Sequence, residues 1–279
     1  MKNKYYILLF LCIFNTQATE VDSFSQRGSD LMDSTIELNE LVNKWLIKAM
    51  LDTNRLQNKN PCNTKLLVKT IAKKFTHFGW SHFEKEVINS SSISQHKPAK
   101  NHIYSGFNTT LKLPNTMTSL LNVNNVFIGA DKFSHFFNEG FNNFKSLYWK
   151  KFKRSYIFEY GHKMETGLWG LKSTGIYSHA DLVSNFEGFR FFESLTKTET
   201  PFFTCQNGTW EMIRKFKWEN YINNAWDEGI NCNTFKNSKL ENIFHNKIKD
   251  LEQSNNMNLT CPIDYCLLYT SPSPRDGLL

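Results

Sequence analysis

The sequence lacks several features that would each have placed it in a class of protein. After its first twenty residues it has no apolar run of about 20 residues, the length that crosses a bilayer. No low-complexity linker divides it into domains. Its basic residues are scattered along the chain apart from one local cluster at 150–154, which argues against nucleic-acid binding. Among the cysteines outside the two terminal segments, Cys62, Cys205, Cys232 and Cys261, no two have the close spacing of zinc ligands. These absences exclude a mature transmembrane span, a nucleic-acid partner and a zinc-finger fold.

The two ends of the chain carry segments that we exclude from the folded domain. Residues 1–18 combine a short basic start, an apolar run over 5–14 and a small-residue cleavage site, which is the pattern of a secretory signal peptide. Residues 266–276 resemble the conceptual translation of a sequencing adapter, so we expect 266–279 to be an artefact. Residues 19–265 then form one domain of a protein that we expect to be exported and soluble, either periplasmic or secreted.

The cysteine content agrees with export. Six cysteines become four once the two terminal segments are set aside, and an even count in an exported protein predicts disulfides. The four are Cys62, Cys205, Cys232 and Cys261. Three pairings are possible, and we favour Cys205–Cys232 or Cys232–Cys261 because each would staple the loop-rich C-terminal region locally.

Apolar periodicity predicts a mainly α fold. Helical spacing predicts helices over residues 31–50, 131–154, 155–165, 179–195, where Ser178 is the cap, and 236–253. A further helix, capped by Asn63 or Thr64, is predicted to run through Leu66 to Phe75. Residues 109–113 and 122–128 alternate enough for short strands, although extended loop fits them as well. The glycine-punctuated stretch 167–175 is typical of a turn.

The most informative stretch begins the helix predicted over 131–154. Asp131, His135 and Glu139 follow one another at i, i+4 and i+8, so they share one stripe of that helix. The opposite stripe is made of phenylalanines. An acid, an imidazole and a second acid on one face can bind a metal, move a proton or form a buried hydrogen-bond network.

The helix predicted over 179–195 offers a matching polar stripe. Asp181, Asn185 and Gly188 follow one another at i, i+4 and i+7, and a glycine there lets another helix pack closely. We therefore predict a central antiparallel helix pair that brings these residues to Asp131 and His135. Asn185 and Gly188, together with Lys132, are the candidate binding residues.

Three interpretations of this polar pair stay open. In the first, Asp131, His135, Asp181 and Asn185 form a hydrogen-bonded network that only fixes the helix register. In the second, a divalent metal such as Zn, Mn or Fe binds to nitrogen and oxygen ligands. Its ligands would be Asp131, His135 and Glu139, with Asp181 as a further candidate. In the third, Glu165 in an aromatic, glycine-rich cleft has a raised pKa and protonates a leaving group, with Asp181 ionised and His135 as ligand or base.

Two motifs resemble those of bacterial envelope families. The run Asp131-Lys132-x-x-His135-Phe136 resembles the D-K-x-x-H-F opening of VanZ-like proteins and of YfiM-type periplasmic lipoproteins. The run Ser178-x-x-Asp181-Leu182-x-x-Asn185-x-x-Gly188 resembles the later D-x-x-x-N-x-x-G helix of the VanZ-like pattern. The resemblance covers residues 129–190 and implies a cell-envelope setting without an established reaction.

Three functions therefore compete. The first is an exported envelope protein of undetermined activity built around the polar helix pair. The second is a metal-dependent or acid–base hydrolase acting on envelope lipid or glycan. The third is a non-catalytic module that binds anionic cell-wall polymer or lipid through the tryptophan-rich C-terminal region and the basic cluster at 150–154. The histidines at 77, 82, 96, 102 and 245 are predicted to lie on the surface, and Trp226-Asp227-Glu228-Gly229 is predicted to be a turn or helix end.

Overall fold

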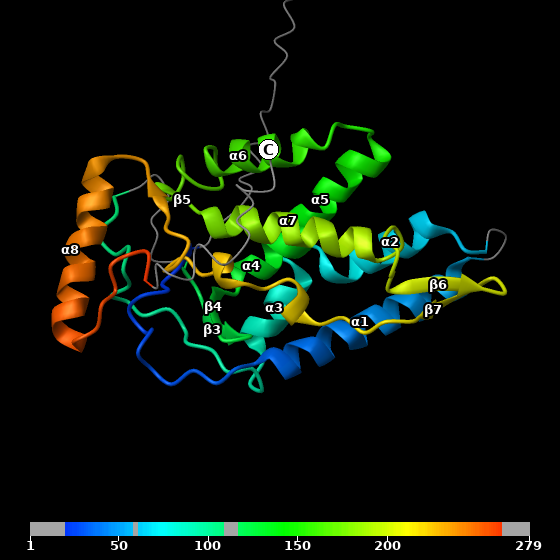
Figure 1. The fold of residues 1–279 in the computed structure, drawn as a ribbon, viewed down its shortest axis with the longest axis horizontal. Coiled ribbons are helices and arrows are strands. Elements are labelled where there is room, and N and C mark those ends of the chain that lie inside the picture. Colours follow the sequence, from blue (N-terminus) through cyan, green and yellow to red (C-terminus); the bar gives the residue numbers. More distant parts are fainter. Residues whose placement is uncertain (1–19, 58–60, 109–116, 264–279) are drawn as a thin grey trace, which may run out of the picture.

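The computed structural model describes residues 20–57, 61–108 and 117–263, so the predicted signal peptide, the 109–113 strand and the adapter-like segment lie outside the described residues. The predicted mainly α fold is confirmed for the described part. In Figure 1, α7 lies at the centre, α1 along the lower edge, α6 along the upper edge and α8 at the left end. The main helices are α1 (Thr35–Leu56), α2 (Thr64–Phe75), α3 (His82–Asn89), α6 (Ser155–Glu165), α7 (His179–Ser194) and α8 (Ser238–Asn255). None of the helices in the described ranges combines the length and the apolarity that a bilayer crossing requires.

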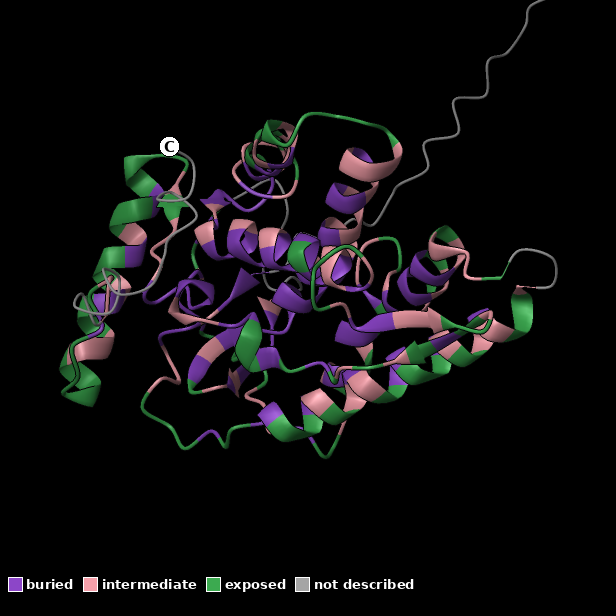
Figure 2. Cartoon of the chain, turned by 45° about the vertical axis from the view of Figure 1, so that its right-hand side comes forward, coloured by how far each residue is buried: buried purple, intermediate pink, exposed green. Residues whose placement is uncertain are grey.

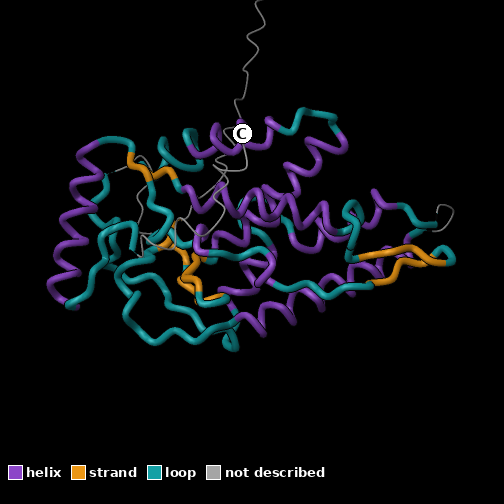
Figure 3. Tube along the Cα trace, viewed as in Figure 1, coloured by secondary structure: helices purple, strands orange, loops and turns teal. Residues whose placement is uncertain are grey.

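The strands form two-stranded pairs between the helices (Figure 3). The antiparallel pairs are β3 (Leu120–Val123) with β4 (Val126–Gly129), β5 (Ile176–Tyr177) with β8 (Thr234–Phe235), and β6 (Phe203–Gln206) with β7 (Thr209–Met212); β1 (Glu20–Val21) runs parallel to β2 (Met117–Thr118). The single short strand predicted over 122–128 is instead a hairpin. Asn124 and Asn125 both have positive φ, 57° and 59°, which is the conformation of a tight two-residue turn.

The helix that begins at Asp131 is not a uniform α-helix. It runs as α4 (Asp131–Ser134), the π-helix η2 (His135–Glu139), α5 (Gly140–Phe144) and the π-helix η3 (Lys145–Trp149). It ends five residues before the predicted end at 154, and the basic cluster at 150–154 is an exposed connection. Because a π-helix has more residues per turn than an α-helix, residues after His135 turn away from the i, i+4 stripe.

The helix at 131–149 packs against α7, as predicted, but the two run in the same general direction. Contacting residues rise together along both helices: Lys132 lies against Asp181, Phe136 against Gly188, and Phe141 against Phe192. The predicted antiparallel arrangement is therefore not confirmed. The physical reason is α6, which lies between the two helices in the sequence. It returns the chain along the upper edge of the molecule to the point where α7 begins, as the colours of Figure 1 show.

The main core is aromatic and lies between α1, α2, α7 and the helix at 131–149. Phe133, Phe136 and Phe137 are completely buried, and Figure 2 shows the same buried surface along the inner sides of these helices. Trp218 and Trp226 are also completely buried, and Trp210 is nearly so. The C-terminal tryptophans therefore build the core, and the prediction that they form a binding surface is wrong.

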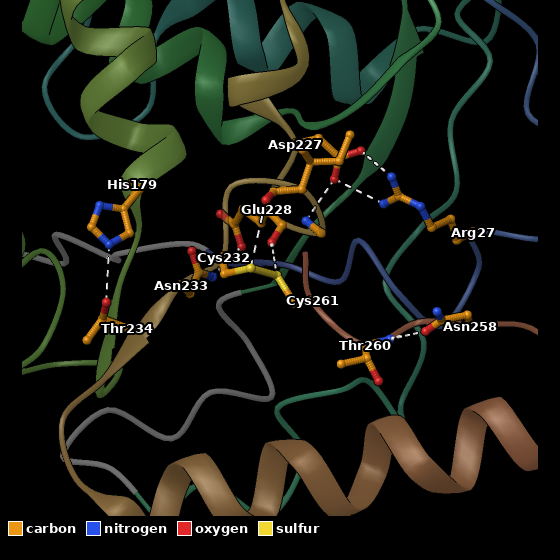
Figure 4. The surroundings of a disulfide bond; sticks show 12 residues. Arg27, His179, Asp227, Glu228, Cys232, Asn233, Thr234, Asn258, Thr260 and Cys261 are labelled. Atoms are coloured by element: carbon orange, nitrogen blue, oxygen red, sulfur yellow. Dashed lines mark hydrogen bonds and ion pairs between the residues drawn. A yellow bond between two sulfur atoms is a disulfide. The ribbon is translucent and has the colours of Figure 1, made fainter. Parts of the chain in front are cut away.

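The two disulfides are Cys232–Cys261 and Cys62–Cys205. The first is one of the two pairings we favoured, and Figure 4 shows its surroundings. The alternative Cys205–Cys232 is wrong, because the β6–β7 hairpin lies along the end of α1 rather than beside Cys232. Gln57 at that end donates to the Gly208 carbonyl at 2.7 Å, which brings Cys205 to the α1–α2 connection that carries Cys62.

Candidate functional site

A completely buried ammonium group lies at the centre of the candidate site. Lys132 has no exposed surface, and its Nζ lies 2.8 Å from Asp131 Oδ2, 2.6 Å from Asp181 Oδ1 and 2.7 Å from Glu228 Oε1. Burial by itself would lower the pKa of Lys132, but the three carboxylates outweigh it and raise that pKa well above the ordinary value. Lys132 is therefore a charged internal cation that holds three elements together.

Glu228 is the partner that sequence reasoning missed. Its Oε1 also accepts from Ser178 Oγ at 3.1 Å, and its Oε2 accepts from Asn233 Nδ2 at 2.7 Å. Figure 4 shows this turn, in which the adjacent Asp227 forms a two-pronged ion pair with Arg27 at 3.0 and 2.6 Å. Both acids are 1% exposed, so this turn is part of the buried network. The sequence did contain one signal for such a partner. Lys132 stands among phenylalanines, and a lysine buried there requires buried counter-ions.

His135 joins the two helices through both ring nitrogens. Its Nε2 lies 3.0 Å from Asp181 Oδ2, and its Nδ1 lies 3.1 Å from Asn185 Oδ1. Burial opposes the charged ring, but Asp181 outweighs it and raises the pKa of His135 to about 10. The ring is therefore an imidazolium that donates from both nitrogens. Burial likewise opposes the charged form of Asp181, but His135 and Lys132 hold the pKa of that carboxyl below its ordinary value.

Two glycines set the close approach that this network requires. A Cβ on Gly188 would lie 1.8 Å from the Phe136 carbonyl oxygen, and a Cβ on Gly140 would lie 2.6 Å from the Cα of Gly188. Both contacts are with backbone, which cannot move aside as a flexible side chain can. Gly188 thus acts through packing. It brings α7 near enough for His135 to reach Asp181 and Asn185.

A cleft of about 250 Å³ opens over one side of the network. Its lining combines aromatic, amide and acidic side chains: His77, Phe78, Gly79, Trp80, Asp131, Ser134, His135, Asn138, Glu139, Asn142, Tyr160, Met164, Glu165, Trp169 and Asn185. Of the predicted catalytic residues, His135 and Glu165 line this cleft. Asp181 is not part of the lining, because Lys132 and His135 hold its oxygens inside the network.

Two carboxyl groups in the cleft wall have raised pKa values. Glu165 is 1% exposed, and burial together with the charge of Asp181 raises its pKa well above the ordinary value. Burial also raises the pKa of Asp131, but Lys132 opposes the rise and the pKa settles at about 6. Near neutral pH, Asp131 is therefore largely ionised, whereas Glu165 keeps its proton to higher pH than an ordinary glutamate does. Asp131 Oδ1 is buried and accepts no hydrogen bond within the described ranges.

The predicted metal ligands are only partly brought together. Ligand atoms of Asp131, His135 and Asp181 all lie within 4.8 Å of one another. Glu139 lies on the cleft wall and accepts from Asn142 at 3.3 Å, and it is not in this group. The Lys132 ammonium already sits between the two aspartates, and a divalent cation there would be strongly repelled. The donor set therefore does not fit a metal.

The remaining histidines are mostly peripheral, as predicted, with one exception. His102 is 3% exposed, so its predicted surface position is wrong. Burial lowers the pKa of His102 and keeps its ring neutral. His77 is exposed but lies at the cleft, next to His82 with a ring-centre distance of 5.0 Å.

Comparison with known protein families, with curated proteins and with solved structures finds no match to this chain. The geometry and chemistry of the cleft, and of the network beneath it, are therefore the basis for a function.

Proposed function

We propose that this chain is an exported cell-envelope protein that hydrolyses a glycosidic bond by acid–base catalysis in the cleft over Lys132. The observation that carries the proposal is that Glu165 and Asp131 line the same cleft in different surroundings, with the pKa of Glu165 raised well above its ordinary value and that of Asp131 at about 6. Two carboxyl groups whose surroundings separate their pKa values are the usual acid and base of glycoside hydrolysis.

The cleft lining favours a glycan over a lipid. Trp80, Tyr160 and Trp169 offer apolar ring surface for the C–H faces of sugars, and the nearby asparagine amides can donate to and accept from hydroxyl groups. A lipid tail would require a wall without such polar groups. The cleft volume of about 250 Å³ suits one or two sugar units rather than an acyl chain.

In the proposed reaction, Glu165 donates its proton to the oxygen of the departing sugar. Asp131 takes a proton from the attacking water, whose oxygen bonds to the anomeric carbon as the glycosidic C–O bond breaks. The proton count balances, and no co-reactant other than water is needed. His135 and Lys132 do not touch the substrate in this scheme. They hold Asp131 and α7 in position.

Three independent features support the exported envelope setting. The predicted signal peptide directs export, and both disulfides belong in an oxidising compartment. The resemblance of the polar helix motifs to those of VanZ-like and YfiM-type proteins favours the envelope.

The test is hydrolysis of a panel of envelope glycans by wild type, Glu165→Gln and Glu187→Gln. Glu187 is the matched control, because it is also a buried glutamate but pairs with Arg190 at 2.6 Å and does not line the cleft. We expect Glu165→Gln to lower kcat by at least about a hundredfold with little change in KM, and Glu187→Gln to leave kcat unchanged. Wild-type activity should rise as pH increases through about 6, where Asp131 ionises. Folded wild-type protein that binds and cleaves no glycan would leave the network with a purely structural role.

A further inference from the structure

The exposed side of α2 carries a row of lysines without acids. Lys65, Lys69 and Lys73 are all exposed and follow one another at i, i+4 and i+8, so they form one stripe. The stripe is about 12 Å long at 1.5 Å per residue. The α2 sequence contains no aspartate or glutamate, and within the described residues none of these three lysines has an ion pair.

A second basic segment lies beside this stripe. The Nζ atoms of Lys65 and Lys69 lie 5.3 and 5.9 Å from the ring centre of Trp149, the last residue of η3. The exposed cluster at 150–154 follows directly, with four basic residues in five. We call Lys65, Lys69, Lys73 and residues 150–154 the lysine face.

The lysine face leads toward the cleft. His77 lies two residues beyond the end of α2 and lines the cleft. A second hollow of about 540 Å³ is lined by three lysines against one acid, namely Lys73, Lys74 and Lys85 against Glu86, and also by His82. Positive charge therefore continues from η3 along α2 to the entrance of the proposed catalytic site.

We propose that the lysine face binds an anionic glycan polymer and presents it to the cleft. This choice of a glycan among polyanions rests on the proposed function. A linear stripe that ends at a cleft suits an extended chain with repeated negative charges, whose approach it would also accelerate. A bilayer would require apolar anchors. Within the described residues, Phe152, at 41%, is the one large hydrophobic side chain strongly exposed on this face.

The experiment measures binding of polygalacturonate, a neutral glucan and vesicles of phosphatidylglycerol in phosphatidylcholine. The test variant is Lys65→Glu/Lys69→Glu/Lys73→Glu. The control is Lys236→Glu/Lys239→Glu/Lys249→Glu, which makes the same charge change at exposed positions on and next to α8. We expect the test variant to raise the Kd for polygalacturonate at least about tenfold and to reduce its salt sensitivity. The control should change that Kd less than about twofold.

Three outcomes would overturn the proposal: equal losses in both variants, no loss in the test variant, or tighter binding of vesicles than of polymer. Melting curves show whether each variant is folded, and exposed lysines should leave Tm unchanged. Failure of the proposed function is distinguishable. If wild type cleaves no glycan but the α2 variant still binds polygalacturonate more weakly than wild type, the docking surface is supported and the hydrolase proposal is wrong.

Discussion

Lys132 has no exposed surface and three carboxylates within 2.8 Å of its ammonium nitrogen. Lys132→Met keeps most of the side-chain volume but leaves three buried acids without their cation. Breaking a buried ion network by removing one partner costs about 3–5 kcal/mol. We expect urea unfolding to show a loss of that size, and Lys163→Met, at an exposed position on α6, to change stability by less than about 0.5 kcal/mol. Equal effects of the two substitutions would contradict the central role of Lys132.

His135 makes stability depend on pH in a direction that can be worked out. Its pKa rises from 6.5 to about 10 on folding, so the folded state holds the proton more tightly than the unfolded state. The resulting stabilisation is complete below pH 6.5 and is lost as pH rises through about 10, at no more than about 1.4 kcal/mol per pH unit. The stability advantage of wild type over His135→Gln should therefore shrink between pH 7 and pH 10 in urea titrations. An advantage that stays constant over this range would show that His135 is not charged in the fold.

Residues close in sequence were predictable, and their distant partners were not. The i, i+4 spacings identified His135, Asp181 and Asn185, because a helix fixes which side chains share a face. Glu228 lies 96 residues from Lys132, and no local pattern encodes that contact. Glu139 was misplaced for a local reason, since the π-helix that begins at His135 changes the helical period there.

At the scale of elements, the contact between α7 and the helix at 131–149 depends on bare backbone. Gly188→Ala would place a methyl group 1.8 Å from a carbonyl oxygen, which forces the helices apart. We expect a loss of about 3 kcal/mol or more, together with loss of the His135–Asp181 contact. Gly161→Ala is the control, because its Cβ would meet side chains and no backbone: the end of Leu182 at 2.9 Å and Asn185 Nδ2 at 4.0 Å. Thermal unfolding of both variants tests this, with a larger fall in Tm expected for Gly188→Ala. Similar Tm values would count against close packing at Gly188.

The disulfides provide a test of how the hairpin and the helices are arranged. Cys62–Cys205 spans 143 residues and joins the α1–α2 connection to β6, while Cys232–Cys261 spans 29. Peptide mapping of the unreduced protein should recover these two crosslinks and no Cys205–Cys232 peptide. Removing the long-range bond by Cys62→Ser/Cys205→Ser should cost about 2–5 kcal/mol. Recovery of a Cys205–Cys232 crosslink would place the β6–β7 hairpin elsewhere.

Element positions were predicted better than their arrangement. Caps and apolar spacing located α2, α6, α7 and α8 to within about two residues. The direction of the helix pair was not predictable from either helix alone, because it depends on the path of α6 between them. The Asn124-Asn125 turn that divides β3 from β4 had a local signal, two adjacent residues that tolerate positive φ.

At the scale of the whole molecule, the cleft is assembled from segments that are far apart in sequence. The turn after α2, the π-helix η2, the end of α6 and the middle of α7 each contribute lining residues. The sequence predicted a cleft near Glu165. It did not predict that residues 77–80 also line this cleft, because they lie far from Glu165 along the chain. Buried Lys132 joins the helix that begins at Asp131 to α7, and both contribute to the lining, so cleft shape and network stability should fail together.

The protonation of Glu165 is the property on which the account of this cleft depends. Carboxyl ¹³C NMR of glutamate-labelled wild type and Glu165→Gln measures it directly, since the resonance absent from the variant belongs to Glu165. The account predicts that this resonance titrates well above the ordinary glutamate pKa. A resonance that titrates near the ordinary glutamate pKa of about 4.3 would contradict it.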